Sequence, residues 1–364
     1  MKYLFIVQGE GRGHLTQAMS LEKMLERNGH SVVEILVGKS KSRKLPEFFL
    51  NGVHAPVEQF ESVNFLTSAT GRKPSMAKSV LYNTFAFFKY FPSIRFLYKK
   101  IISSGADVVV NFYELLTGMT YMFHRISVPN VCIGHQYLFK HKDFGLPHAK
   151  SPLAAGLMFF TNMTGRGASK YLALSFRDFG PDREHKIVAV PPLLRPEVLN
   201  LRKVDGLVER GHYILGYMLN SGFSEDVLKW HNSHPDVSLK FFWDRWSEGK
   251  VKKIDDTLSF FLIDDKEFLK QMAKCGAYAS TAGFESVCEA IYLGKPVMMV
   301  PSHIEQEINA FDAMRIGAGV SAMEFDLTKL LEFASEYKPV GEFVAWVESS
   351  EKKILYELEH PTVC

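Results

Sequence analysis

The sequence predicts an α/β protein made of two doubly wound domains, each built on a parallel sheet. Three observations predict this class. Short, wholly apolar segments alternate with segments whose apolar residues recur every three or four positions, the pattern of buried parallel strands and covering helices. The alternation occurs twice, on either side of a proline-rich stretch at residues 190–196. A length of 364 residues is itself ordinarily divided between two domains.

The first series opens with an apolar strand at residues 3–7 that ends in a glycine cluster. A helix is predicted at 15–28, where Gly29 ends it, and a strand at 31–37. Strand, helix and strand within about 35 residues form a βαβ unit, whose strands are parallel. The same order recurs as a strand at 107–111, a helix at 115–125 and a strand at 130–133.

The second series follows the proline-rich stretch. Its predicted strands are 213–217, 239–242, 259–263, 277–280 and 296–300, and its predicted helices are 225–232, 267–274 and 285–293. We therefore predict an N-terminal domain at 1–195 and a C-terminal domain at 210–340. Ligands of open parallel sheets bind beyond the carboxyl ends of the strands, so the residues that follow each strand are the candidates for a site.

The net charge of +3 hides an asymmetry. Residues 1–200 hold 25 Lys and Arg against 14 Asp and Glu, whereas 201–364 hold 18 against 26, which predicts domains with different partners. A hydrophobic share of 46% excludes a disordered chain. The four scattered cysteines predict reduced thiols, and no apolar run approaches the roughly 20 residues that span a bilayer. The start has only five apolar residues before the glycine cluster, too few for a signal peptide. We expect a cytoplasmic protein, with peripheral contact at the inner face of the cell membrane left open.

The letters GEGRGH at residues 9–14 form a glycine loop after the first strand. Its glycines permit a tight turn and leave amides at a helix N-terminus, where an anion can bind. An NAD fingerprint is disfavoured, because the last glycine comes one residue early and no acidic residue ends the second strand. His14 is predicted either to cap the helix or to act as a general base.

Residues 280–310 carry the richest pattern. A run of small residues, 280–283, precedes a predicted helix whose amides and dipole could hold a diphosphate. Glu289, within that helix, could accept hydrogen bonds from ribose hydroxyls, and Glu305 and Gln306 after the next strand could do so from a sugar. The alternative is an ordinary exposed helix face, on which acidic residues are common.

This segment resembles the donor-binding region of GT-B glycosyltransferases. It is most similar to the UDP-glycosyltransferases and to the bacterial N-acetylglucosaminyltransferase that acts on the lipid-linked peptidoglycan precursor. Those families share a small-residue loop, a glutamate before a G-x-P strand and a D/E-Q-x-x-N-A stretch, here STAG at 280–283, Glu289 before GKP at 294–296, and EQEINA at 305–310. The resemblance implies that Thr281, Ala282 and Gly283 hold the pyrophosphate. It also implies that Glu289 binds the ribose and that Gln306, with Glu305 or Glu307, contacts the donor sugar.

Other segments resemble the same family in the same order. GRGHLTQA at 11–18 is similar to its first glycine loop and histidine, and VPPLLR at 190–195 to a stretch whose arginine, here Arg195, reaches the diphosphate. LIDD at 262–265 is similar to a turn whose backbone, here at Ile263, recognises uracil. The second glycine loop departs from the pattern, and only Ser221 and Gly222 keep a phosphate role.

The resemblance implies a GT-B fold, in which two Rossmann-like domains face each other across a cleft and helices at 341–364 pack back on the first. It implies a UDP-sugar as co-substrate, inversion at the sugar, His14 as the base, and no metal or other cofactor. The acidic pair Asp264 and Asp265 is disfavoured as a metal site because adjacent residues on a turn point apart. Cys132 and the histidines that follow it fit no zinc spacing. Residues expected on the acceptor side follow the first-domain strands: Gly11, Arg12, Gly13, Asn111, Glu114 and His135.

Residues 62–106 contain no acidic residue but seven basic and nine aromatic ones. The stretch at 72–100 is predicted either to contact an anionic membrane surface or to pack a helix into the core with a basic outer face. No nucleic-acid module is recognised. We expect a glycosyltransferase that moves a sugar from a UDP-sugar to a hydroxyl acceptor, with a lipid-linked or cell-envelope glycan as one option. The alternatives are a UDP-sugar 2-epimerase and a non-catalytic nucleotide-sugar-binding protein.

Overall fold

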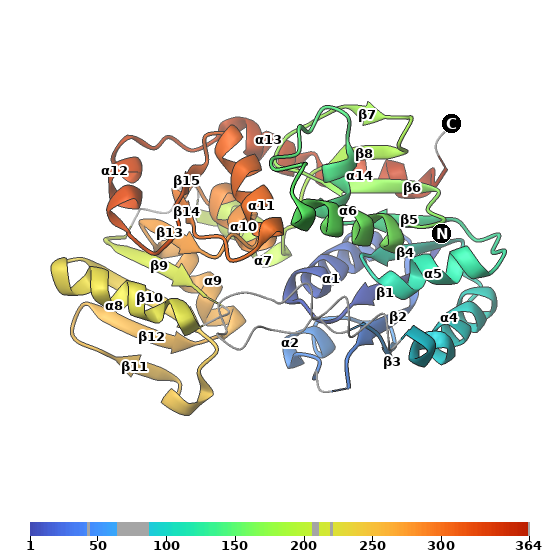
Figure 1. The fold of residues 1–364 in the computed structure, drawn as a ribbon, viewed down its shortest axis with the longest axis horizontal. Coiled ribbons are helices and arrows are strands. Elements are labelled where there is room, and N and C mark those ends of the chain that lie inside the picture. The colour runs from blue at the N-terminus through green and yellow to red at the C-terminus, as the bar shows by residue number, and fades with distance from the viewer. Residues whose placement is uncertain (42–43, 64–86, 206–210, 219–220, 363–364) are drawn as a thin grey trace. The chain divides into compact units, whose positions relative to one another are not determined.

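The computed structural model describes residues 1–41, 44–63, 87–205, 211–218 and 221–362. These residues form two compact units (Figure 1). The first unit holds the described residues of 1–195 together with 346–362, and the second unit holds those of 196–345. Each unit carries its own mostly parallel sheet with helices, so the predicted fold class is confirmed.

The sheet of the first unit has eight strands in the order β3-β2-β1-β4-β5-β6-β8-β7. All neighbouring pairs are parallel except β7 with β8. The strands that lie centrally are buried along nearly their whole length, which matches their apolar sequences. Their bounds are β1 (Lys2–Gln8), β2 (Ser31–Lys39), β3 (Val57–Glu61), β4 (Val108–Phe112), β5 (Asn130–Ile133), β6 (Lys170–Leu174), β7 (Pro181–Asp182) and β8 (Ile187–Val190).

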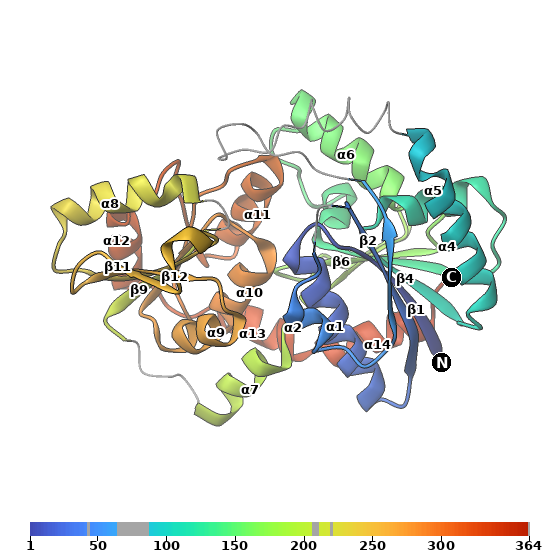
Figure 2. The same cartoon turned by 90° about the horizontal axis from the view of Figure 1, so that it is seen from below.

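Helices cover both faces of this sheet, with α4, α5 and α6 on one side and α1 and α14 on the other (Figure 2). Their bounds are α1 (Arg12–Arg27), α2 (Glu47–Leu50), α4 (Phe91–Ser103), α5 (Leu115–Phe123), α6 (Pro152–Thr164) and α14 (Ser350–Glu359), with short 3-10 turns η1 (Phe87–Tyr90) and η2 (His135–Lys140). On α4 the side chains of Ile94, Leu97 and Ile101 are buried in one cluster with Leu4 and Val109 of the sheet. Each such buried side chain stabilises the fold by roughly 1.5–3 kcal/mol.

The second unit has a seven-stranded sheet in the order β11-β12-β10-β9-β13-β14-β15, parallel except at β11. Its strands are β9 (Tyr213–Tyr217), β10 (Ser238–Trp243), β11 (Val251–Lys253), β12 (Leu258–Leu262), β13 (Ala277–Ser280), β14 (Val297–Met299) and β15 (Gly319–Ser321). Its helices are α7 (Pro196–Asp205), α8 (Ser224–Ser233), α9 (Asp265–Lys274), α10 (Phe284–Tyr292), α11 (Ile304–Arg315) and α12 (Thr328–Glu336), with short turns η3 (Ser221–Phe223) and η4 (Trp246–Glu248). The chain then enters α13 (Gly341–Glu348), within which it passes to the first unit.

The end of the chain packs on the first unit. The indole of Trp346 donates a 3.0 Å hydrogen bond to the carbonyl of Ser175. The ammonium of Lys170, a residue only 3% exposed, lies 2.7 Å from a carboxylate oxygen of Glu357 and also donates to the carbonyl of His360. A buried ammonium needs such partners, because leaving it without them costs several kcal/mol.

Candidate functional site

The loop between β1 and α1 is tied to the neighbouring strand β2. The amide of Gly9 donates to the carbonyl of Gly38 at 2.7 Å, and a Cβ on Gly9 would collide with Val37 and with that carbonyl. The carboxylate of Glu10 accepts a 2.6 Å bond from the amide of Ser40. Glycine at position 9 therefore permits a close approach that fixes where α1 begins.

His14 lies in the first turn of α1, which begins after Gly11, and is half-buried. Its Nδ1 lies 3.3 Å from the amide oxygen of Gln17, one helical turn further on. Its ring stacks on Tyr113 with centroids 5.6 Å apart and planes at 27°. Arg12, in the same turn, places its guanidinium 4.8 Å from the ring centre of Phe48.

Tyr113 directly follows β4, the strand beside β1, so the two loops meet at the carboxyl edge of the sheet. Its φ of +61° is uncommon for a residue with a side chain. The ring is 4% exposed, and its hydroxyl lies 2.7 Å from Oγ1 of Thr161 on α6. Tyr113 and Gln17 were not predicted as site residues. The one sequence signal for Tyr113 is its place immediately after a buried strand.

Glu114 caps α5 from the same turn. Its Oε1 accepts hydrogen bonds from the amide of Leu116 at 3.0 Å and from the hydroxyl of Ser62 at 2.5 Å. Burial raises the pKa of this carboxyl to about 7, and the nearby Glu10 acts in the same direction. Gly38 makes room for it, since a Cβ there would overlap the carboxylate of Glu114.

Two further residues predicted on the acceptor side hold this edge together. Asn111 is fully buried; its amide nitrogen donates to the carbonyl of Thr164 at 2.9 Å and its amide oxygen accepts from the backbone of Glu114 at 2.9 Å. The Nδ1 of His135, 2% exposed, lies 2.7 Å from the carbonyl of Leu174, and burial lowers its pKa to about 4. Acceptor contact by these two residues stays a prediction.

At the second sheet, the turn from β13 into α10 holds the predicted diphosphate residues. Ala282 is fully buried with φ +59°, and its amide donates to the Ser280 hydroxyl at 3.3 Å. Asn309 of α11 donates to the carbonyl of Ala282 at 3.0 Å. Thr281 is 6% exposed, and Gly283 is the N-cap of α10. The turn is thus held in an unusual backbone shape that places the first amides of α10 at the carboxyl edge.

The remaining donor-side residues lie on the two helices that flank this turn. Glu289 is in the second turn of α10 and 1% exposed. Glu305, Gln306 and Glu307 form the first turn of α11, where Glu305 is half-buried and Glu307 exposed. The amide oxygen of Gln306 accepts bonds of 2.8 and 2.7 Å from the backbone and hydroxyl of Ser302.

Four other predicted residues follow strands of the second sheet or lie where the chain passes between the units. Gly222 lies in η3 after β9, which pairs with β13, so both connections lie at one edge; for Ser221 only the backbone is described. Ile263 follows β12, and its amide donates to the carbonyl of Trp243 at 3.0 Å. Arg195 is the last residue of the first unit before the chain enters the second.

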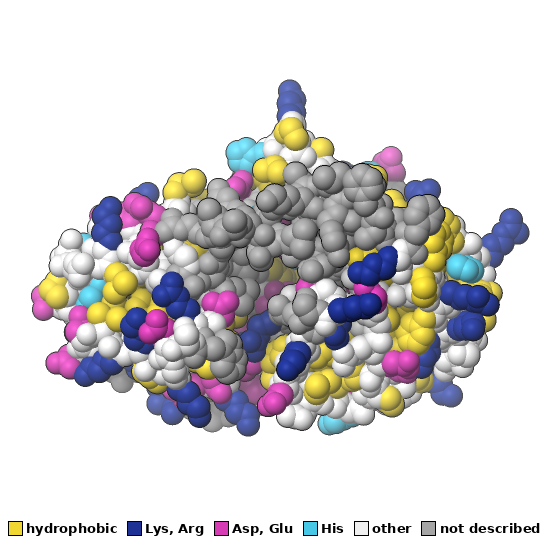
Figure 3. Space-filling model, turned by 60° about the horizontal axis from the view of Figure 1, so that its bottom comes forward, with side chains coloured by type: hydrophobic (Ala, Val, Ile, Leu, Met, Phe, Trp, Pro, Cys, Tyr) yellow, Lys and Arg dark blue, Asp and Glu magenta, His cyan; other side chains and the backbone are white. Residues whose placement is uncertain are grey.

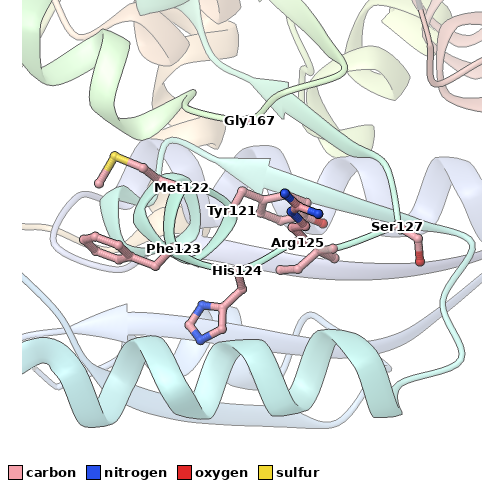
Figure 4. A pocket seen from close by; sticks show the side chains of 8 residues that line it. Tyr121, Met122, Phe123, His124, Arg125, Ser127 and Gly167 are labelled. Carbon is pink, nitrogen blue, oxygen red and sulfur yellow. The ribbon is translucent and has the colours of Figure 1, made fainter.

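A surface hollow lies elsewhere, around the end of α5 (Figure 4). It is lined by residues 121–127 and Gly167 and holds about 720 Å³. Because α5 begins at the carboxyl edge of the sheet and runs away from it, this hollow lies at the other end of α5 from Glu114. His124 points from it toward α4 (Figure 4), where it stacks on Tyr98.

The described part of the chain contains no group of three or more His, Cys, Asp or Glu arranged to hold a metal ion. None of its helices is long and apolar enough to cross a membrane.

Comparisons with known proteins identify the family through one family model and the fold through solved structures. The model of glycosyl transferase family 1 matches residues 1–337. No curated protein sequence matches. Several solved structures are similar over nearly the whole of both chains. The glycotransferase of kitacinnamycin has 14% sequence identity and a TM-score of 0.64, and the match covers 100% of this chain and 99% of that one. LpCGTa in complex with UDP has 13% sequence identity and a TM-score of 0.64, again over 100% of this chain and 99% of that one. A third is UGT89C1 of Arabidopsis thaliana complexed with quercetin, with 15% sequence identity and a TM-score of 0.65 over 98% of each chain.

Proposed function

Because the chain belongs to glycosyl transferase family 1 and has the GT-B fold, we propose that this glycosyltransferase moves a sugar from a UDP-sugar to a hydroxyl acceptor. The observation that carries the proposal is the β13–α10 turn. It combines a left-handed Ala282, a clamping bond from Asn309 and a helix N-terminus directly behind. Amides at a helix N-terminus are a natural site for a diphosphate.

On this proposal the second unit binds the donor. Thr281, Ala282 and Gly283 hold the diphosphate, with Ser221, Gly222 and Arg195 assisting. Glu289 accepts hydrogen bonds from the ribose hydroxyls, and Gln306 with Glu305 or Glu307 contacts the sugar. The backbone at Ile263 receives the uracil. UDP is favoured as the nucleotide because LpCGTa, which shares the fold, was solved in complex with UDP.

The first unit binds the acceptor, with Gly11, Arg12, Gly13 and Glu114 near the reacting hydroxyl and His14 as the base. The acceptor oxygen attacks the anomeric carbon while the bond from that carbon to the diphosphate breaks. The acceptor proton passes to His14, and UDP leaves with the bonding electrons. A helix N-terminus stabilises the negative charge that develops on the leaving diphosphate, and no metal ion is required for this. Attack from the face opposite the leaving group inverts the anomeric centre.

The donor is tested by thermal shift with UDP, GDP, dTDP and NAD, each with and without EDTA. We expect UDP to raise the melting temperature most, and EDTA to leave that rise unchanged. Stabilisation by NAD but not by UDP overturns the proposal.

The base is tested with His14→Ala, assayed with a UDP-sugar and hydroxylated acceptors. Loss of a general base costs about 10²–10⁴-fold in kcat. We expect that loss together with an unchanged affinity for UDP. A variant that transfers sugar as fast as the parent removes His14 from the mechanism.

The surface of α4, α5 and α6 indicates which kind of acceptor the protein uses. These three helices contain no Asp or Glu. Large apolar side chains are exposed on them: Phe91 (43%), Phe123 (47%), Leu153 (53%) and Phe159 (69%). Phe91 and Phe123 lie 6.2 Å apart between ring centres, and Arg95, Lys99 and Arg125 are exposed on α4 and just after α5. In the right-hand part of Figure 3, hydrophobic and basic side chains lie interspersed over the first unit.

Such a surface suits an anionic bilayer, which would present a lipid-linked acceptor. The stretch predicted for this contact, 72–100, is described only from residue 87. Within it Lys89 pairs with Glu61, and Lys100 pairs with Glu34 and Glu58. The contact is therefore assigned to Arg95, Lys99 and the exposed phenylalanines.

Flotation with anionic and with neutral vesicles tests this surface. The triple variant Phe91→Ser, Arg95→Ser, Lys99→Ser should lose flotation with anionic vesicles. A matched change of three exposed residues of the second unit, Val251→Ser, Lys250→Ser and Lys270→Ser, should not. Equal flotation of both variants contradicts the membrane contact and leaves the transferase proposal standing.

A further inference from the structure

The imidazole of His14 is held between two neighbours on different elements. Gln17, from its own helix, reaches Nδ1 along the ring plane, and Tyr113, from the loop after β4, covers a ring face. Both are nearly buried, at 1% and 4% exposure. A half-buried histidine with two buried neighbours has little freedom to turn.

Gln17 constrains the proton on the ring. The atom 3.3 Å from Nδ1 is the amide oxygen of Gln17, and an amide oxygen only accepts hydrogen bonds. Nδ1 must therefore carry a hydrogen when this bond is made. In the neutral ring the other nitrogen, Nε2, then holds the lone pair that can accept a proton.

Tyr113 constrains the plane of the ring. A left-handed backbone costs a residue with a side chain roughly 1–2 kcal/mol and persists only where its surroundings impose it. Here the hydroxyl is anchored to Thr161, and the rings of Tyr137 and Phe160 pack against the aromatic ring at centroid distances of 5.6 Å. These contacts hold the face of Tyr113 against His14.

We propose that Gln17 and Tyr113 are positioning residues that fix the tautomer and the plane of the His14 ring, so that Nε2 is the atom that receives the acceptor proton. The inference rests on the proposed function. As the acceptor oxygen bonds to the anomeric carbon, its proton moves to Nε2, and the resulting imidazolium keeps its Nδ1 hydrogen on the Gln17 oxygen. A neutral amide holds the ring without the added basicity that a carboxylate would confer.

The other titratable groups at this edge have bonds of their own. The carboxylate of Glu10 accepts from the amide of Ser40, and that of Glu114 from Ser62 and Leu116. Arg12, on the same helix as His14, has its guanidinium over Phe48. A change in the pH profile of a Gln17 variant can be compared with Glu10→Gln, which removes a charge from the loop but leaves Gln17 in place.

The tautomer is tested without any substrate, by nitrogen-15 NMR of histidine-labelled full-length protein, with His14→Ala to assign the signal. We expect the parent protein to show a protonated Nδ1 on His14. Gln17→Met, of similar shape but without an acceptor, should move the proton toward Nε2. An unchanged His14 signal in Gln17→Met overturns the role of Gln17.

Steady-state kinetics then test whether the positioning of the His14 ring by Gln17 and Tyr113 affects sugar transfer. Gln17→Met should lower kcat about tenfold at an unchanged KM for the UDP-sugar, and Gln17→Glu should move the acidic limb of the pH profile upward by about one unit. Tyr113→Leu should lower kcat similarly, whereas Tyr113→Phe, which keeps the ring, should stay within about twofold of the parent. Equal losses in the two Tyr113 variants overturn its role.

The failure of this inference and that of the proposed function can be told apart. If His14→Ala transfers sugar normally, the proposed base is wrong whatever the NMR result. If His14→Ala is inactive but Gln17→Met keeps both the parent tautomer and the parent kcat, only the positioning role is wrong.

Discussion

The carboxyl edges of the two sheets are built in opposite ways. At the first edge the polar groups are side chains, among them His14, Glu10 and Glu114, and Gly38 leaves the space that Glu114 occupies. At the second edge the central feature is backbone, the turn through Ala282 that Asn309 holds in place. Side chains can take up and release protons, whereas backbone amides offer a fixed dipole. The contrast suits a proposed division into proton transfer at the first edge and diphosphate binding at the second.

The largest effect is expected from adding one methyl group at the first edge. Gly38→Ala would force its Cβ into the buried carboxylate of Glu114 and the ring of Phe60. We expect a loss of about 2–4 kcal/mol in the free energy of unfolding, measured in urea, because the carboxylate must leave its hydrogen bonds. Gly29→Ala is the control: its φ is +77° but its Cβ would meet nothing within 4 Å, so it should cost only about 1 kcal/mol. Equal losses would show that the space beside Glu114 is not tight.

Glu114 should make stability depend on pH. Burial raises the pKa of its carboxyl from 4.5 to about 7, so between these values the folded chain keeps a proton that the unfolded chain loses. Stability from this group is therefore full below pH 4.5 and falls as pH rises toward 7, by at most about 3 kcal/mol. Glu114→Gln should flatten that slope in urea unfolding at pH 5, 6, 7 and 8. A slope that is the same in both proteins would contradict the raised pKa.

A smaller effect, on the affinity for UDP, is expected from substitutions of Asn309 at the second edge. Asn309→Ala removes the bond that holds the Ala282 carbonyl. Loss of about 1.4 kcal/mol of preorganisation corresponds to a tenfold weaker affinity for UDP, measured by calorimetry. Asn309→Asp, which sets a carboxylate against that carbonyl, should weaken binding further. Unchanged UDP affinity in both variants would mean that the shape of the turn does not matter for the donor.

The smallest effect on the free energy of unfolding is expected from removing a helix cap in the second unit, which can be compared with a cap in the first. Asp264 caps α9 in the second unit through a 2.8 Å bond to the amide of Glu267, as Glu114 caps α5 in the first. Asp264 is exposed, so Asp264→Ala should cost about 1 kcal/mol of unfolding free energy and Asp264→Asn much less. A larger cost for Asp264→Ala than for Glu114→Ala would reverse the contrast between the two edges.

Most of the fold could be predicted from the sequence, because many of its central strands are short apolar runs. Strands 3–7, 213–217 and 277–280 were predicted to within a residue or two of β1, β9 and β13. Edge strands such as β3 and β11, with the sequences VEQFE and VKK, have no such run and were not predicted. The internal strands β6 and β8, with the sequences KYLAL and IVAV, have one and were missed all the same. The helix α6 was also missed, because the sequence PLAAGLMFFTNMT lacks a polar face that would reveal its period.

The candidate site was predictable only in part. Glycines, the histidine after them and the small residues 280–283 stand out along the chain because their spacing has a physical meaning. The stack of Tyr113 on His14 could not be predicted, because it depends on a left-handed backbone that tyrosine does not favour. Nor could the burial of Glu114, which depends on a space cleared by Gly38, 76 positions earlier in the sequence.

Because the end of the chain packs on the first unit, it affects the order in which the two units can complete their folding during synthesis. The described residues of the second unit form a single stretch, 196–345, so all of them are synthesised before α14. Until then the buried Lys170 lacks Glu357 and the carbonyl of His360, and β8 lacks the helix that packs beside it. Domains generally fold as units, the N-terminal one first. Here we expect a different order, because the described residues of the second unit are all synthesised before the first unit has the helix that completes it.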